Sequence, residues 1–279
     1  MKHFMLDGFN SVQSKLDDMR YLYDFIVQTV NELNMSPIMP PMLLPYYHGD
    51  TAEDNGVSAF VLLCGGHFTI HTFTYRECYF ADILYPEHYD TRRLTGKFRE
   101  KLPFNCRIHP TILDRRLQME QIEIDVNKPL EDQVGINTEE DFGPHFFAEV
   151  KNVKGNISMD SLFNMLEGLP KAVHMTPIMR PYVLKDKANN PSYISGMTMI
   201  AESHIAIHYE IESKTLYVDI FSCKFQANWK EFKGTLEKYF NSQIVFHFIA
   251  RGSKYQSKAD LSERKHKYDN WLDVVGYEK

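Results

Sequence analysis

Residues 34–41 read NMSPIMPP and residues 174–181 read HMTPIMRP, so the pattern Met-Ser/Thr-Pro-Ile-Met-x-Pro occurs twice, 140 residues apart. Three further segments recur in the same order with nearly the same offset. The pairs are residues 3–5 with 145–147, residues 66–71 with 203–208, and residues 80–84 with 218–221. Self-similarity at a constant spacing is the signature of a repeated structural unit. The chain is therefore predicted to be a tandem duplication.

Each copy has the same expected order of elements, judged from hydrophobic periodicity and β-branched runs. The first copy should have strands near 3–8, 57–63, 67–74, 78–84 and 105–113, and helices near 16–30 and 90–102. The second should have strands near 145–150, 195–201, 204–210, 215–222 and 243–250, and helices near 158–172 and 229–240. Strands in the middle with helices outside predict an α+β fold. We expect two duplicated units, each a mostly antiparallel sheet with helices on one face, packed as an αββα sandwich.

The expected boundaries follow from composition and from the repeat. Residues 1–116 form the first copy, 117–143 an acidic connector, 144–250 the second copy, and 251–279 a C-terminal tail expected to be helical. With 43% hydrophobic and 24% charged residues, the chain can bury a sizeable core. A net charge of −6 does not favour a nucleic-acid partner. No apolar run approaches the ~20 residues of a membrane span. Four cysteines without CxxC spacing predict a reducing, cytoplasmic location.

The second copy carries the segment whose residues could support catalysis. It reads Ala201-Glu202-Ser203-His204, with His208 five residues and Cys223 twenty residues after Ser203. This pattern closely resembles the processing and catalytic signature of S-adenosylmethionine decarboxylases of the bacterial and archaeal type, here in a tandem-fused form. The resemblance implies a pyruvoyl-dependent decarboxylase that acts in polyamine biosynthesis and cuts its own Glu202–Ser203 peptide bond.

The implied chemistry requires these residue types. If Ser203 Oγ attacks the Glu202 carbonyl, the amide becomes an ester, and elimination and hydrolysis then leave a pyruvoyl group at residue 203. Such a carbonyl forms a Schiff base with a substrate amine and accepts the electrons released by loss of CO2. An acid must return the proton, and the resemblance assigns that role to Cys223.

The two copies differ at the residues that matter. The first copy has Gly66 where the second has Ser203, and Pro86 where the second has Cys223, so it cannot form its own pyruvoyl group. It keeps Ser58 and His71, at positions where the family has a serine and a histidine that assist processing from the opposite half. The expectation is one composite site. On alternating strand positions, Ser203 and His208 point to opposite faces, which leaves room for a histidine from the other copy.

Substrate choice stays open between S-adenosylmethionine, which we place first, and ornithine or arginine, and an unprocessed binding partner of a true decarboxylase is a further alternative. Phe147 matches the family's adenine-stacking aromatic. Tyr75 and Glu77 in the first copy, and Glu212 in the second, are the other candidate substrate contacts. The histidine pairs 67/71 and 204/208 lie in strand-like runs, so no metal site is expected. The partner should be a small amino-acid-type molecule, and the protein a monomer or homodimer.

Overall fold

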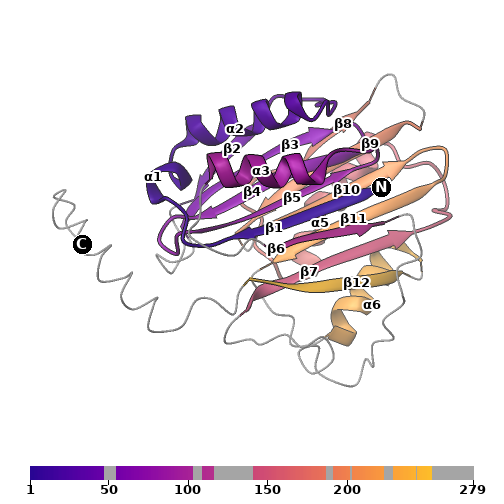
Figure 1. Ribbon diagram of the computed structural model, residues 1–279. Coiled ribbons are helices and arrows are strands. Elements are labelled where there is room, and N and C mark those ends of the chain that lie inside the picture. Colours follow the sequence, from indigo (N-terminus) through magenta and orange to yellow (C-terminus); the bar gives the residue numbers. More distant parts are fainter. Residues whose placement is uncertain are drawn as a thin grey trace.

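The computed structural model describes residues 1–46, 55–102, 109–115, 141–186, 191–201, 203–222, 229–242 and 244–252. Within them the chain forms two units of the same design, one after the other, whose sheets face each other (Figure 1). The expected connector falls outside these residues except for 141–143. The tail falls outside them except for residues 251 and 252.

The first unit is built as strand, helices, four strands, helix and strand. Its elements are β1 (Lys2–Gly8), α1 (Gln13–Leu16), α2 (Met19–Glu32), β2 (Met42–Tyr46), β3 (Gly56–Leu63), β4 (Gly66–Phe73), β5 (Cys78–Tyr85), α3 (Thr91–Lys101) and β6 (His109–Asp114). The second unit repeats this plan. Its elements are β7 (Asp141–Val150), α5 (Met159–Ala172), β8 (Tyr182–Lys185), β9 (Tyr193–Ile200), β10 (Ser203–Glu210), β11 (Thr215–Ser222), α6 (Trp229–Phe240) and β12 (Val245–Gly252).

Sheet topology confirms the duplication. The first sheet has the order β2-β3-β4-β5-β1-β6, and the second has β12-β7-β11-β10-β9-β8. Read from its other end, the second order is the first one with each strand replaced by its counterpart in the repeat. Every neighbouring pair is antiparallel, as expected.

The layers follow from burial of both sheet faces. Figure 1 shows α2 and α3 on the outer face of the first sheet, and α5 packs on β8, β9 and β10 of the second. Every residue of β4, β5, β10 and β11 is buried. In β10, Ile205 and Ile207 pack in the core under α5 and α6, whereas His204 and His208 contact the first unit. The αββα sandwich is confirmed.

The repeated Met-Pro segments end against the inner strands, in the same way in both units. Pro37 forms an isolated bridge with Leu63, and Pro177 forms one with Ile200. The edge strands that follow, β2 and β8, were not predicted from the sequence. Each is short and partly exposed, so neither carries the alternation that marks a strand. Ser158 is the N-cap of α5, because its side chain accepts a hydrogen bond from the Ser161 N–H.

Candidate active site between the two sheets

Ser58 and His71 lie opposite each other on the paired strands β3 and β4. Ser58 Oγ and His71 Nδ1 are hydrogen-bonded at 2.8 Å. Ser58 is half-buried and His71 is almost fully buried. Burial lowers the pKa of His71 well below its ordinary value, and the neighbouring His204 adds to that effect. At neutral pH, His71 is therefore an uncharged imidazole that can exchange a proton with a hydroxyl group.

His71 also reaches the second unit. Its Nε2 lies 2.7 Å from Nδ1 of His204, and the two rings stack with centroids 5.0 Å apart at an angle of 8°. His204 directly follows Ser203, so a hydrogen-bonded chain runs from Ser58 through His71 to the residue beside the expected cleavage point. The two residues expected to help from the first copy are thus joined to each other and to the segment they should serve.

Ser203 is the first residue of β10, and it combines two unusual properties. Its hydroxyl is buried and, among the described residues, has no hydrogen-bond partner. Its backbone has φ 147°, a region that residues with a side chain rarely adopt. An unsatisfied buried hydroxyl and a strained backbone both raise the energy of the intact chain at this point. The structure places no direct hydrogen bond between Ser203 Oγ and either Ser58 or His71.

Gly66 is the counterpart of Ser203 in the first unit, and it has no room for a side chain. A Cβ atom on Gly66 would lie 1.9 Å from the Leu84 carbonyl oxygen. The difference between the copies therefore extends beyond one missing hydroxyl group, because the backbone around residue 66 is packed for glycine alone.

The hydrogen-bonded series Ser58–His71–His204, called the helper chain below, has a symmetric counterpart in the second unit. Ser195 Oγ is 2.8 Å from His208 Nδ1, and His208 Nε2 is 2.8 Å from His67 Nδ1 of the first unit. His208, expected as a catalytic residue from its spacing, thus pairs with Ser195 and His67. This second chain leads back to the vicinity of Gly66, where no serine is available.

Two fully buried aspartates, Asp82 and Asp219, lie between the histidine chains. Asp82 Oδ1 is 2.7 Å from His3 Nε2, and Asp219 Oδ1 is in close contact with His145 Nε2. Burial opposes ionisation of both carboxyls, but the attraction of His3 and His145 holds the pKa of each below its usual range. Burial lowers the pKa of His145 to about 4. The cluster therefore consists mainly of ionised carboxylates and neutral imidazoles.

Two buried arginines cross the interface in opposite directions. Arg251, at the end of β12, binds Asp7 of the first unit at 2.6 and 2.8 Å and lies over the ring of Phe221. Arg115, after β6, donates to the carbonyl oxygens of Ala148 and Val218 in the second unit, both at 3.1 Å. Sequence reasoning assigned no role to these arginines, and it used the two aspartates only to align the repeat. The available signal was an aspartate in an apolar strand, once in each copy.

The candidate substrate contacts are spread over three places. Because His71 faces His204 and His67 faces His208, β4 and β10 run antiparallel across the interface. The turn after β4, with Tyr75 and Glu77, is therefore at the Ser203 end, whereas Glu212, in the turn after β10, is at the opposite end. Glu212 accepts a hydrogen bond from the Ser192 N–H. Phe147 is fully buried mid-sheet, against His3, His145 and Arg115. Glu202 and Cys223 lie outside the described residues.

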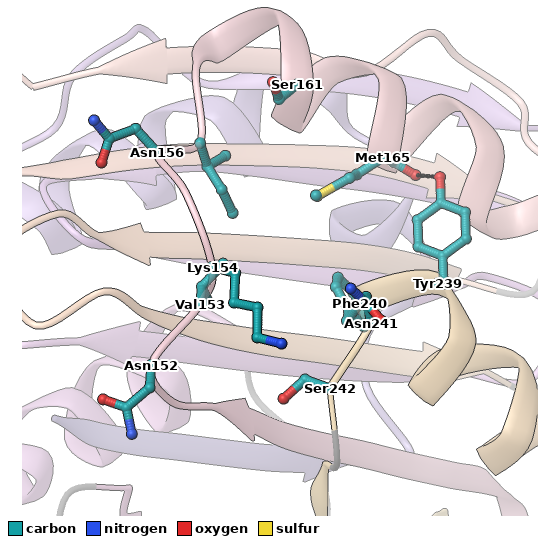
Figure 2. A pocket seen from close by; sticks show the side chains of 11 residues that line it. Asn152, Val153, Lys154, Asn156, Ser161, Met165, Tyr239, Phe240, Asn241 and Ser242 are labelled. Atoms are coloured by element: carbon teal, nitrogen blue, oxygen red, sulfur yellow. Dashed lines mark hydrogen bonds between the residues drawn. The ribbon is translucent and has the colours of Figure 1, made fainter.

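A separate cavity of about 310 Å³ lies in the helical layer of the second unit. Figure 2 shows it between the loop at 152–157, α5 and the end of α6, with Lys154, Asn156 and Ser242 among its lining side chains. Tyr239 closes one side and donates a hydrogen bond to the Met165 carbonyl oxygen at 2.7 Å. None of the expected site residues lines this cavity.

Comparison with known proteins fits this geometry. The sequence profile of the family described as S-adenosylmethionine decarboxylase matches residues 2–115 and 144–252, which are the two units in turn. The chain belongs to the S-adenosylmethionine decarboxylase family. Its two matched segments confirm the tandem form.

Individual relatives correspond to one unit. An S-adenosylmethionine decarboxylase proenzyme of Archaeoglobus fulgidus is 29% identical over 113 residues, which is 39% of this chain and 97% of that protein. A proenzyme of Thermodesulfovibrio yellowstonii is 35% identical over 83 residues, 29% of this chain and 58% of that protein. The crystal structure of the adenosylmethionine decarboxylase from Aquifex aeolicus VF5 aligns with a TM-score of 0.36 and 22% identity, over 43% of this chain and 98% of that one. Within the described residues, no helix is long and apolar enough to cross a membrane.

Proposed function

We propose that this family member is a self-processing, pyruvoyl-dependent decarboxylase of S-adenosylmethionine, and that its one active site forms at the Ser203 end of the interface. The observation that carries the proposal is the chain Ser58–His71–His204, which ends beside a buried, unpartnered Ser203 hydroxyl on a strained backbone. The relatives named as S-adenosylmethionine decarboxylase proenzymes support both the precursor state and the substrate.

Processing begins when Ser203 Oγ attacks the Glu202 carbonyl carbon. The peptide C–N bond breaks, the serine hydroxyl proton passes to the nitrogen, which becomes a free amine, and an ester joins the two residues. Loss of the Ser203 α-proton then breaks the Cβ–O bond, so residues 1–202 leave with a free carboxylate. Water hydrolyses the remaining dehydroalanine with release of ammonia, and residue 203 becomes a pyruvoyl group. His71, an uncharged imidazole hydrogen-bonded to Ser58, is the proposed proton carrier for these steps.

The residues around Ser203 fit such a group, because Ser203 begins a buried strand and the adjacent His204 contacts His71, an imidazole whose pKa is lowered by burial. A pyruvoyl carbonyl supplies an electron-withdrawing centre for a substrate amine. Cys223 is the proposed acid that returns a proton to the substrate α-carbon after CO2 leaves, a role that requires a thiol of suitable pKa. Tyr75 and Glu77, at the Ser203 end, are the proposed contacts for the rest of the substrate.

Intact mass of the purified protein tests processing. We expect two fragments, split before residue 203, and a single full-length chain in Ser203→Ala. Cys223→Ala should still cleave but lose about 10²–10⁴-fold in turnover, whereas Cys78→Ala should retain activity. CO2 release from S-adenosylmethionine, ornithine and arginine, offered in parallel, then identifies the substrate. An uncut wild-type chain would reject the enzyme in favour of an unprocessed binding partner.

A further inference from the structure

The buried interface contains a group of nitrogen and oxygen atoms to which the proposed function gives no role, apart from His204 with its Nδ1 contact to His71. Side chains of His67 and Asp82 from the first unit and His204 from the second place ligand-type atoms within 4.8 Å of one another. Asp82 presents one carboxylate oxygen to each ring, with Oδ1 3.3 Å from His67 Nε2 and Oδ2 3.2 Å from His204 Nε2. All three side chains are buried.

Two atoms here lack the hydrogen bonds that buried polar groups normally have. Within the described residues, His204 Nε2 has no hydrogen-bond partner, and Asp82 Oδ2 lies 3.2 Å from it. Asp219 Oδ2 also makes no hydrogen bond within the described residues, although it lies 3.4 Å from His3 Nε2, 3.7 Å from His67 Nε2 and 3.9 Å from Arg115 Nη1. Leaving a buried donor or acceptor unsatisfied costs about 1–3 kcal/mol. His204 Nε2 faces the Asp82 carboxylate within the group of three, so a cation bound there would satisfy it.

We propose that His67, Asp82 and His204 bind a divalent transition-metal ion, with Zn²⁺ the best match. Ligands about 2.0–2.1 Å from a tetrahedral Zn²⁺ lie roughly 3.4 Å from one another. The 3.3 Å contact between Asp82 Oδ1 and His67 Nε2 matches this edge length, and the other carboxylate oxygen, Oδ2, lies 3.2 Å from His204 Nε2.

Behind each ligand stands the kind of partner that metal sites use to orient histidines. His67 Nδ1 faces His208 Nε2 at 2.8 Å, and His208 is in turn bonded to Ser195. His204 Nδ1 faces His71 in the same way. With the metal on the Nε2 atoms of His67 and His204, the Nδ1 atom of each ring can donate a hydrogen bond outward, to His208 and His71 respectively.

A second set of four residues, His3, Asp82, His145 and Asp219, is also close together but fits a metal less well. Arg251 donates to His145 Nδ1 at 3.2 Å, so the proton of a neutral His145 must sit on Nε2, where it faces Asp219. In the part of the chain that the structure describes, His3 Nδ1 has no hydrogen-bond partner. We therefore assign His3 and His145 to the outer shell, where they donate to the two aspartates.

Metal binding can be measured on the full chain, stripped with chelator and titrated with Co²⁺. We expect one ion per chain, with the visible absorption of a tetrahedral site lacking thiolate ligands, and displacement by Zn²⁺. His67→Gln should abolish the site, and Ser195→Ala, which alters only the outer shell, should weaken it about 10–100-fold. His88→Gln, on an exposed histidine, is the matched control and should bind normally.

The Ser203→Ala chain should bind Co²⁺ as the wild type does, so this test is independent of processing. Absence of stoichiometric Co²⁺ binding by the wild type would overturn the site, as would unchanged affinity in a correctly folded His67→Gln. If His67→Gln does not fold, an unchanged affinity in Ser195→Ala is the overturning result.

Discussion

His71 Nε2 lies 2.7 Å from His204 Nδ1, which joins the two copies of the repeat at the residue next to Ser203. The mirror contact, between His67 and His208, has nearly the same length, so the interface is close to twofold symmetric. Only one of the two ends has a serine at the start of the inner strand. The symmetry therefore offers a matched control for each functional residue.

Ser58→Ala should slow self-cleavage about 10²–10⁴-fold, because it removes the hydroxyl group from the helper chain that leads to Ser203. Ser195→Ala removes the equivalent hydroxyl from the mirror chain and should leave the cleavage rate unchanged. Gel-resolved cleavage of freshly translated protein measures both. Equal slowing in the two variants would show that the helper chain is not specific to the Ser203 end.

Gly66→Ser should give no second cleavage and should destabilise the fold by about 1–3 kcal/mol, because the new Cβ meets the Leu84 carbonyl oxygen at 1.9 Å. Gly96→Ala is the control. It lies in α3 with nothing within 4 Å of its Cβ, and it should gain up to about 1 kcal/mol. Denaturant unfolding compares the two. A Gly66→Ser protein as stable as wild type would contradict the close packing.

The free energy of unfolding should fall as pH drops below about 6.5. Burial lowers the pKa of His3, His71, His145 and His208, so the unfolded chain binds more protons than the folded one between that pH and the lowered values, about 4 for His145. Each histidine that must take up a proton contributes about 1.4 kcal/mol per pH unit. Asp82 and Asp219, with lowered pKa, lose their stabilising charge at still lower pH, in the same direction. Urea midpoints measured from pH 7.5 to 5 check this, and a constant midpoint would refute it.

Arg251→Ala should cost about 3–5 kcal/mol, since it leaves Asp7 without its buried cation and removes a side chain packed on Phe221. Arg93→Ala breaks an exposed ion pair with Glu32, which solvent screens, and should have a much smaller effect on stability. Thermal unfolding of the two variants gives the comparison. If the losses are similar, the buried pair does not hold the units together.

The sequence was sufficient for the repeat, the order of most strands and helices, and the packing of two sheets, because each copy repeats the same periodic pattern. It could not reveal β2 and β8, whose short, partly exposed segments lack alternation. It identified Ser58 and His71 of the first copy as residues that assist processing, but it gave no role in the site to Asp82, Arg115 or Arg251. Those side chains act across the interface, on residues far away in the chain, and no local pattern encodes that pairing.

The order β12-β7-β11-β10-β9-β8 has a consequence for folding before and after cleavage. A cut before Ser203 would leave β7, β8 and β9 on one polypeptide and β10, β11 and β12 on the other, with β7 held between β12 and β11. The strands of the two pieces would alternate in the sheet, and separating them would break the hydrogen bonds on both sides of β7. The chain would therefore have to fold before it is cleaved. After denaturation, refolding would require two separate polypeptides to associate, so cleavage would make folding irreversible in practice.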